Sequence, residues 1–215
     1  MDPMLTRLKT LQPEVDYQAL MAQMTPQSHP RRKLKELQRK GMLIRVKKGF
    51  YVLSPEVIGR SFSHEVMANL LYGPSYVSLE SALSIHGLIP ERVETWTSVT
   101  TQKNKSFNTP IGHFFYSHLH PSLYPLAVTF GDTADQRHFL LATPEKALLD
   151  IFALKFKSAD RPTLNDVRLA LEEDLRVSLK KLRKSVSRES VNALIPAYRN
   201  RPWCRLFLDL LKEES

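Results

Sequence analysis

The chain has 215 residues, 42% of them hydrophobic and 25% charged, so it can bury one large core or two small ones without disulfide staples. Its 31 Lys and Arg residues outnumber its 22 Asp and Glu residues, and the net charge of +9 favours nucleic acid as a partner over acidic membrane surfaces and acidic proteins. The single cysteine, Cys204, excludes an internal disulfide and a cysteine-rich zinc finger. Because no signal peptide or membrane-spanning stretch is recognisable, we expect a cytoplasmic protein with no membrane partner.

The positive charge is concentrated in two regions of the chain. Residues 1–54 carry 11 basic and 4 acidic side chains, residues 55–154 carry 6 and 9, and residues 155–215 carry 14 and 9. Most of the first excess lies between Arg31 and Lys48, where nine basic residues accompany a single acid, Glu36. A solvated helix face and a nucleic-acid surface would both explain this composition, so the order of the predicted elements has to decide.

The first 54 residues contain patterns typical of three helices and a hairpin. We expect helices over residues 3–11, 14–23 and 27–40, and β-strands over residues 42–46 and 49–53. Pro13 separates the first two helices, the turn Thr25-Pro26 follows the second, and Gly41 ends the third. Lys47-Lys48 joins the two strands in a tight turn. This order predicts a winged helix-turn-helix domain.

Such a domain places its third helix in the major groove of DNA and its hairpin, or wing, against flanking phosphates. Leu34 and Leu37 must face the first two helices, so the basic side chains lie on the outer surface. The candidate DNA-binding residues are Gln27, Ser28, Arg31, Arg32, Lys33, Lys35, Arg39, Lys40, Lys47 and Lys48. Arg31 or Arg32 suits a bidentate contact with guanine, and the residues that suit phosphates are Lys33, Arg39, Lys40, Lys47 and Lys48. A winged helix that binds only protein is the alternative.

A domain boundary is predicted near residue 58, which divides the chain into residues 1–58 and 59–215. Helices are expected to end at Gly73-Pro74 and at Gly87, and a further helix to begin at Thr143-Pro144. Strands are predicted over residues 94–101, 111–119, 126–130 and 137–142, and later helices over residues 163–171, 175–184, 187–194 and 203–212. We therefore expect an α+β fold, with a winged helix-turn-helix domain before a larger α/β domain that has a small sheet and several helices.

The larger region offers few residues for catalysis or metal binding. Four histidines fall in or near predicted strands, namely His113, His118, His120 and His138. No acid or cysteine lies beside the first three at ligand spacing, so packing or surface positions are favoured. Glu145 and Asp150 point about 140° apart on one helix and cannot form a site by themselves. We expect no enzyme, cofactor or metal, and a metal-dependent enzyme with an accessory winged helix is an alternative.

Three segments resemble the AbiEi family of antitoxins and transcriptional regulators of type IV toxin–antitoxin systems. They are SLESALSIHGL (Ser78 to Leu88), ATPEKALLD (Ala142 to Asp150) and, in the family's winged-helix domain, KLKELQRKGMLIRVKKGFYVL (Lys33 to Leu53). The resemblance covers most of residues 5–155. It implies a repressor that binds inverted repeats upstream of its own operon and counters a nucleotidyltransferase-like toxin, without implying that it binds the toxin.

The resemblance also assigns roles to particular residues. It transfers the DNA-contacting role onto Ser28, Arg31, Arg32, Lys35, Lys47 and Lys48. It supplies no catalytic residue, so Ser78, His86, Glu145 and Asp150 are interpreted as structural. A plain winged-helix transcription factor with a ligand-binding or dimerisation domain, and an RNA-binding protein, are further alternatives. The basic run from Lys180 to Lys184 is either a solvated helix face or an additional nucleic-acid contact.

Overall fold

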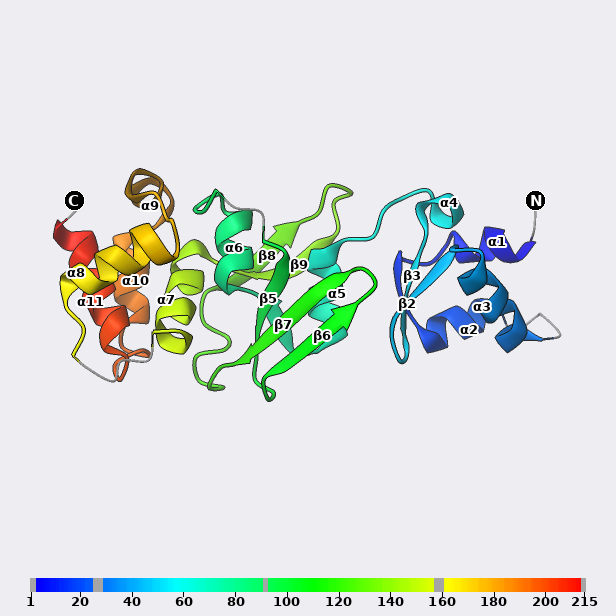
Figure 1. Ribbon diagram of the computed structural model, residues 1–215, viewed down its shortest axis with the longest axis horizontal. Coiled ribbons are helices and arrows are strands. Elements are labelled where there is room, and N and C mark those ends of the chain that lie inside the picture. The colour runs from blue at the N-terminus through cyan, green and yellow to red at the C-terminus, as the bar shows by residue number, and fades with distance from the viewer. Residues whose placement is uncertain (1–2, 25–28, 91–92, 157–160, 214–215) are drawn as a thin grey trace.

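The computed structural model describes residues 3–24, 29–90, 93–156 and 161–213. The protein has a mixed α/β fold with a three-stranded and a six-stranded sheet. Figure 1 shows an elongated molecule, with the three-stranded sheet and its helices at one end, the six-stranded sheet in the middle and the C-terminal helices at the other end. None of the helices in the described ranges is both long and apolar enough to cross a bilayer.

The described residues up to Ile58 form the N-terminal module. Its elements are α1 (Pro3–Leu8), β1 (Glu14–Asp16), α2 (Tyr17–Met24), α3 (Pro30–Arg39), β2 (Leu43–Lys47), β3 (Phe50–Leu53) and α4 (Pro55–Ile58). The strands are antiparallel in the order β1-β3-β2. The three helices and the hairpin are confirmed, and Leu34 and Leu37 are buried as expected, with 7% and 2% of their surface exposed. Thr25-Pro26 lies outside the described residues.

Three details of the expected N-terminal elements are wrong. The first helix, expected to reach residue 11, ends at Leu8. The helix expected from residue 14 begins only at Tyr17, because the Asp16 side chain accepts the Ala19 amide at 2.8 Å and so caps the helix. The preceding residues pair with β3 as a strand instead. The hairpin turn is Lys48-Gly49 rather than Lys47-Lys48, because Gly49 adopts a φ of 88° that β-branched and bulky residues avoid.

The six-stranded sheet, which we term the central sheet, is mixed and has the order β6-β7-β5-β4-β9-β8. Its strands are β4 (Ser75–Val77), β5 (Thr95–Thr100), β6 (Lys105–Thr109), β7 (Gly112–His118), β8 (Val128–Asp132) and β9 (His138–Ala142). The four predicted strands are confirmed. Sequence reasoning missed β4, which has only three residues, and β6, whose polar side chains are mostly exposed.

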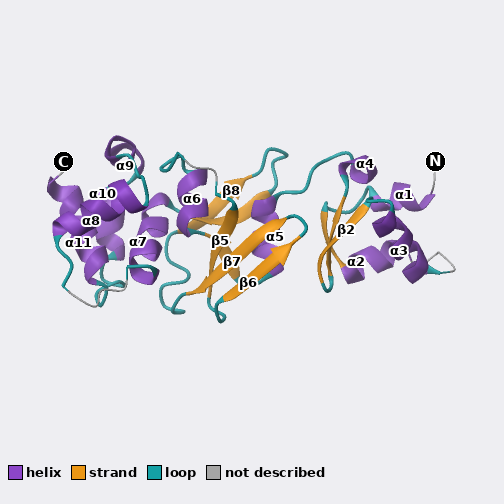
Figure 2. Ribbon diagram, viewed as in Figure 1, coloured by secondary structure: helices purple, strands orange, loops and turns teal. Residues whose placement is uncertain are grey.

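Helices surround the central sheet. Helix α5 (His64–Leu71) packs on one face of it, and α6 (Leu79–Ile85) follows β4 (Figure 2). The chain then continues through α7 (Pro144–Leu154) into α8 (Leu164–Leu169), a π-helix (Ala170–Asp174), α9 (Leu179–Ser185), α10 (Arg188–Leu194) and α11 (Pro202–Glu213). The later helices are confirmed, but α9 begins four residues after its expected start because Arg176 adopts a φ of 51° that no helix accommodates.

The buried apolar side chains form two clusters. The smaller one joins α1, α2 and α3 to α4 through residues such as Leu8, Leu20 and Val57. The larger one runs from the central sheet into the C-terminal helices and includes two hairpin residues, Val46 and Val52. The hairpin therefore contributes to both clusters. The domain boundary near residue 58 stays a prediction.

The start of α7 shows how a local sequence pattern sets a helix end. Pro144 occupies the first helical turn, and the Thr143 hydroxyl accepts the Lys146 amide at 3.3 Å, as the sequence predicted for a capping threonine. We expect Thr143→Ala to lower the free energy of unfolding by about 1 kcal/mol and Thr143→Ser to leave it nearly unchanged. Urea denaturation followed by circular dichroism measures both, and an equal loss in the two variants would contradict the capping role.

Candidate nucleic-acid interface

The outer face of α3 is an exposed basic surface. Because Leu34 and Leu37 hold the helix against the smaller core, its other side faces solvent. Arg31, Arg32, Lys35 and Arg39 are exposed on that side. We call these four residues the α3 basic face. Three of them, Arg32, Lys35 and Arg39, share one side of the helix and line a surface hollow of about 280 Å³ together with Glu36.

Glu36 divides the basic side chains of α3 into two groups. Its carboxylate lies 3.1 Å from the Lys33 ammonium and 2.8 Å from that of Lys40. Hydrogen bonds from Lys40 and Lys33 lower the pKa of Glu36 to about 2, so it stays ionised at neutral pH. Within the described parts of the chain, the side chains of the α3 basic face have no such partner. Their charge is therefore available to an anion.

The two hairpin lysines have different surroundings. Lys48 is exposed in the turn. The Lys47 ammonium instead donates to the Leu71 carbonyl and lies 4.9 Å from the ring centre of Phe50 and 5.1 Å from that of Phe107. Burial lowers the pKa of Lys47. Lys47 thus connects the hairpin to the central sheet in this structure, which disfavours the phosphate contact predicted for it.

The remaining sequence-predicted DNA ligands are Gln27 and Ser28, which lie outside the described residues. No signal in the sequence separated Lys33 and Lys40 from Arg32 and Arg39, because all four stand three or four residues from Glu36 on one helix. Only the folded protein shows that Glu36 pairs with the two lysines.

Three of the histidines weighed as metal ligands each have a polar partner of their own. The Nδ1 atom of His118 is 2.9 Å from the Gln102 carbonyl, and that of His120 is 2.8 Å from the Ser122 hydroxyl. His138 lies beside Asp132, with 2.5 Å between Nδ1 and the carboxylate. Across the described ranges, no three His, Cys, Asp or Glu side chains are grouped so that they could hold a metal ion.

A buried polar network connects the central sheet to the C-terminal helices. Asp150 of α7 is 0% exposed and accepts hydrogen bonds from Lys146 at 2.6 Å and from Tyr198 at 2.8 Å. Its second oxygen accepts hydrogen bonds from Tyr76 at 2.9 Å and Ser78 at 3.0 Å. Burial and the Asp150 carboxylate raise the pKa of both tyrosines, which keeps them as neutral donors.

The charge balance in this network comes from Lys146. Its side chain is 0% exposed, and burial lowers its pKa while the Asp150 carboxylate opposes that shift. The sequence argued against a shared site for Glu145 and Asp150, and Glu145 accepts the Ser187 amide at 2.8 Å. Lys146 was missed as a partner, although it stands four residues before Asp150 on the same helix.

Cys204 lies next to this network. Its thiol is buried and donates to the Leu149 carbonyl at 3.5 Å, and burial raises its pKa. Because the thiolate is the reactive form, we expect Ellman's reagent to modify Cys204 only after the protein unfolds. The control is the same chain in denaturing guanidinium. Rapid modification of the native protein would contradict the buried position.

The fold and this surface define a mixed α/β protein with an exposed basic helix beside a three-stranded sheet. Comparison of the chain with models of protein families and with curated proteins finds no match. A proposal about function therefore rests on the residues of the α3 basic face.

Proposed function

We propose that the protein is a transcriptional repressor that binds double-stranded DNA through α3. The observation that carries this proposal is the α3 basic face, four cationic side chains that are exposed on a helix whose opposite side is buried. A helix of this kind fits the major groove, where Arg reads guanine bidentately and Lys contacts phosphate. The element order of the N-terminal module supports a winged helix-turn-helix, with Lys48 in the turn of the wing.

The resemblance to AbiEi antitoxins gives the proposal its biological setting. In that setting the protein binds inverted repeats upstream of its own operon, represses it and counters a nucleotidyltransferase-like toxin as the antitoxin of a type IV system. The resembling segments Ser78 to Leu88 and Ala142 to Asp150 contain Ser78 and Asp150, which hydrogen-bond each other in the core. This contact supports a structural role for both residues. Binding to the toxin is not part of the proposal.

An electrophoretic shift assay tests the DNA-binding part. The protein is titrated against its own upstream DNA and against a scrambled duplex of equal length, at two salt concentrations. We expect preferential binding to the upstream DNA that weakens steeply with salt, because each neutralised phosphate releases counterions. Equal, weak binding to both duplexes would contradict a sequence-specific repressor.

Co-expression tests the antitoxin part. We expect a nucleotidyltransferase encoded by the neighbouring gene to inhibit growth when it is expressed alone. Co-expression of this protein should restore growth. Specific DNA binding without relief would instead favour a plain transcription factor with a ligand-binding or dimerisation domain. The α3 basic face supports DNA binding in either case.

A further inference from the structure

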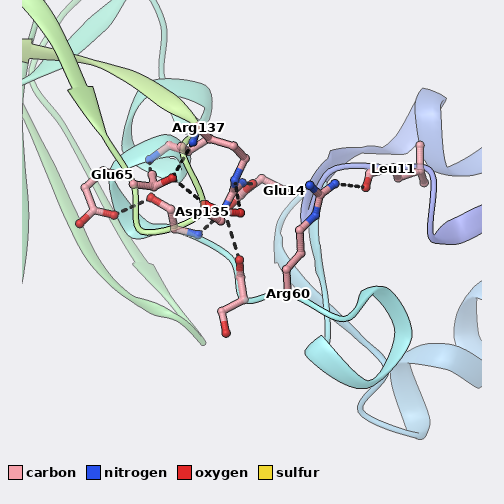
Figure 3. A network of polar contacts seen from close by, with 10 residues as sticks. Leu11, Glu14, Arg60, Glu65, Asp135 and Arg137 are labelled. Carbon is pink, nitrogen blue, oxygen red and sulfur yellow. Dashed lines mark hydrogen bonds and ion pairs between the residues drawn. The ribbon is translucent and has the colours of Figure 1, made fainter.

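The N-terminal module meets the central sheet through a buried ion pair. The Glu14 carboxylate, in β1, is 0% exposed and pairs with the Arg137 guanidinium from the turn between β8 and β9 (Figure 3). Glu14 also accepts the Ser63 amide at 2.5 Å. The Glu14 carboxylate therefore contacts both the central sheet, through Arg137, and the segment that connects this sheet to the module, through Ser63.

Arg137 is itself held in place from the other side. Its guanidinium donates to Asp135 at 2.8 Å and to the Ser61 carbonyl at 3.2 Å, and only 14% of its side chain is exposed. These contacts fix a side chain that is otherwise flexible, so less conformational entropy is lost when it pairs with Glu14. The ion pair has a defined geometry.

Two further polar contacts lie at this junction, beside the packing of Val46 and Val52 into the larger core. Arg60 donates to the Leu11 carbonyl at 2.9 Å (Figure 3), and Lys47 donates to the Leu71 carbonyl. Both acceptors are backbone carbonyls. When such a contact opens, water can take the place of the carbonyl as the acceptor for the Arg60 or Lys47 side chain. Glu14 differs, because opening the ion pair leaves a buried carboxylate without its countercharge unless the junction fills with water.

We propose that the Glu14–Arg137 pair is a latch that fixes the orientation of the N-terminal module on the central sheet, and that this orientation sets the affinity for DNA. The second half rests on the proposed function. The proposal is favoured by geometry: Glu14 lies in β1, which pairs with β3, so the latch acts on the same small sheet as the hairpin beside α3. A cavity of about 470 Å³ borders the latch and is lined by Ser63 and Arg137 among others, which gives water access to the pair once it opens.

Spin labels measure the orientation directly. Cysteines introduced at the exposed positions Lys9 and Asn108 carry one label on the module and one on the central sheet, while Cys204 is buried. Pulsed electron paramagnetic resonance then gives the distribution of distances between the labels. We expect a narrow distribution in the parent protein and a broad one in Arg137→Ala. A narrow distribution in Arg137→Ala would overturn the latch.

DNA affinity is measured on the same proteins with the duplex from upstream of the gene. If opening the latch leaves about one tenth of the molecules in the binding orientation, the Kd rises about tenfold. Lys103→Ala is the matched control, because it removes one exposed positive charge from the connection between β5 and β6 and leaves the latch intact. We expect Lys103→Ala to leave the distance distribution unchanged and to change the Kd less than about twofold.

Glu14→Gln provides a second route to the open latch if Arg137→Ala folds poorly. The amide keeps an acceptor for the Ser63 amide but loses the charge that holds Arg137. The distance distribution of the double variant should be no broader than that of either single variant, because both substitutions remove the same ion pair. A broad distribution with unchanged DNA affinity would overturn the regulatory half alone. If the parent protein binds no DNA specifically, the link between orientation and DNA affinity is wrong, and so is the proposed function. The distance measurements would still test whether the ion pair fixes the orientation.

Discussion

Asp150→Ala is expected to lower the free energy of unfolding by about 3–5 kcal/mol, because it leaves a buried charge without its partner. Asp150 is completely buried and accepts hydrogen bonds from Lys146, Tyr198, Tyr76 and Ser78. Alanine leaves the Lys146 ammonium in the core with no countercharge and leaves three hydroxyl groups short of an acceptor. Urea denaturation measures the loss, and the m-value shows whether unfolding stays two-state.

Two control variants separate the buried charge from ion pairing in general. Asp209→Ala breaks the surface pair with Lys212, in which the two charged atoms are 2.6 Å apart, and is expected to cost less than about 1 kcal/mol. The double variant Asp150→Leu with Lys146→Met replaces both charges by apolar groups and should recover the part of the loss that comes from the unpaired ammonium, while the hydroxyls of Tyr76, Ser78 and Tyr198 still lack their acceptor. If Asp150→Ala costs no more than Asp209→Ala, the network has no structural importance.

Alanine at Arg32, Lys35 and Arg39 together is expected to remove most of the DNA affinity. These residues line one hollow on α3, and loss of the phosphate contacts of Lys35 and Arg39 would reduce the slope of log K against log salt by about two. Arg32→Ala alone should also relax sequence preference, because a bidentate contact with guanine discriminates between bases. Fluorescence anisotropy at four or more salt concentrations measures both effects.

The hairpin supplies matched controls for this measurement. Lys48→Ala should reduce the salt slope by about one, because Lys48 is exposed in the turn. Lys47→Ala should leave the slope unchanged, because that ammonium faces the Leu71 carbonyl and the Phe107 ring. An unchanged slope in the triple α3 variant would contradict DNA binding through α3, and a lower slope in Lys47→Ala would place Lys47 on the DNA.

Much of the fold follows from local patterns in the sequence. Leu34 and Leu37 fixed the inner face of α3, and Thr143 with Pro144 marked the first turn of α7, because periodicity and capping act within a few residues. The strand β1 was missed because it has three residues and is stabilised by pairing with β3, more than thirty residues later. Tertiary contacts of this kind have no local signature.

The candidate site divides in the same way. Charge density and element order indicated α3, but the spacing to Glu36 did not tell which basic residues pair with it, because Arg32 and Arg39 stand at the same spacings as the paired Lys33 and Lys40. The position of Lys47 was not predictable, since its partners Leu71 and Phe107 come from parts of the chain that meet it only in the folded protein. The network around Asp150 likewise brings Tyr76 and Tyr198 together over more than a hundred residues.

The hairpin contributes Val46 and Val52 to the larger core, while α3 belongs to the smaller one. Unfolding of the central sheet therefore removes the packing contacts of Val46 and Val52, which lie on the two strands of the hairpin beside α3. The thermal stability of the central sheet then limits the temperature range over which the N-terminal module keeps its shape. A protease that cuts the central sheet would remove the packing around Val46 and Val52, while the contacts of α3 with the smaller cluster would remain.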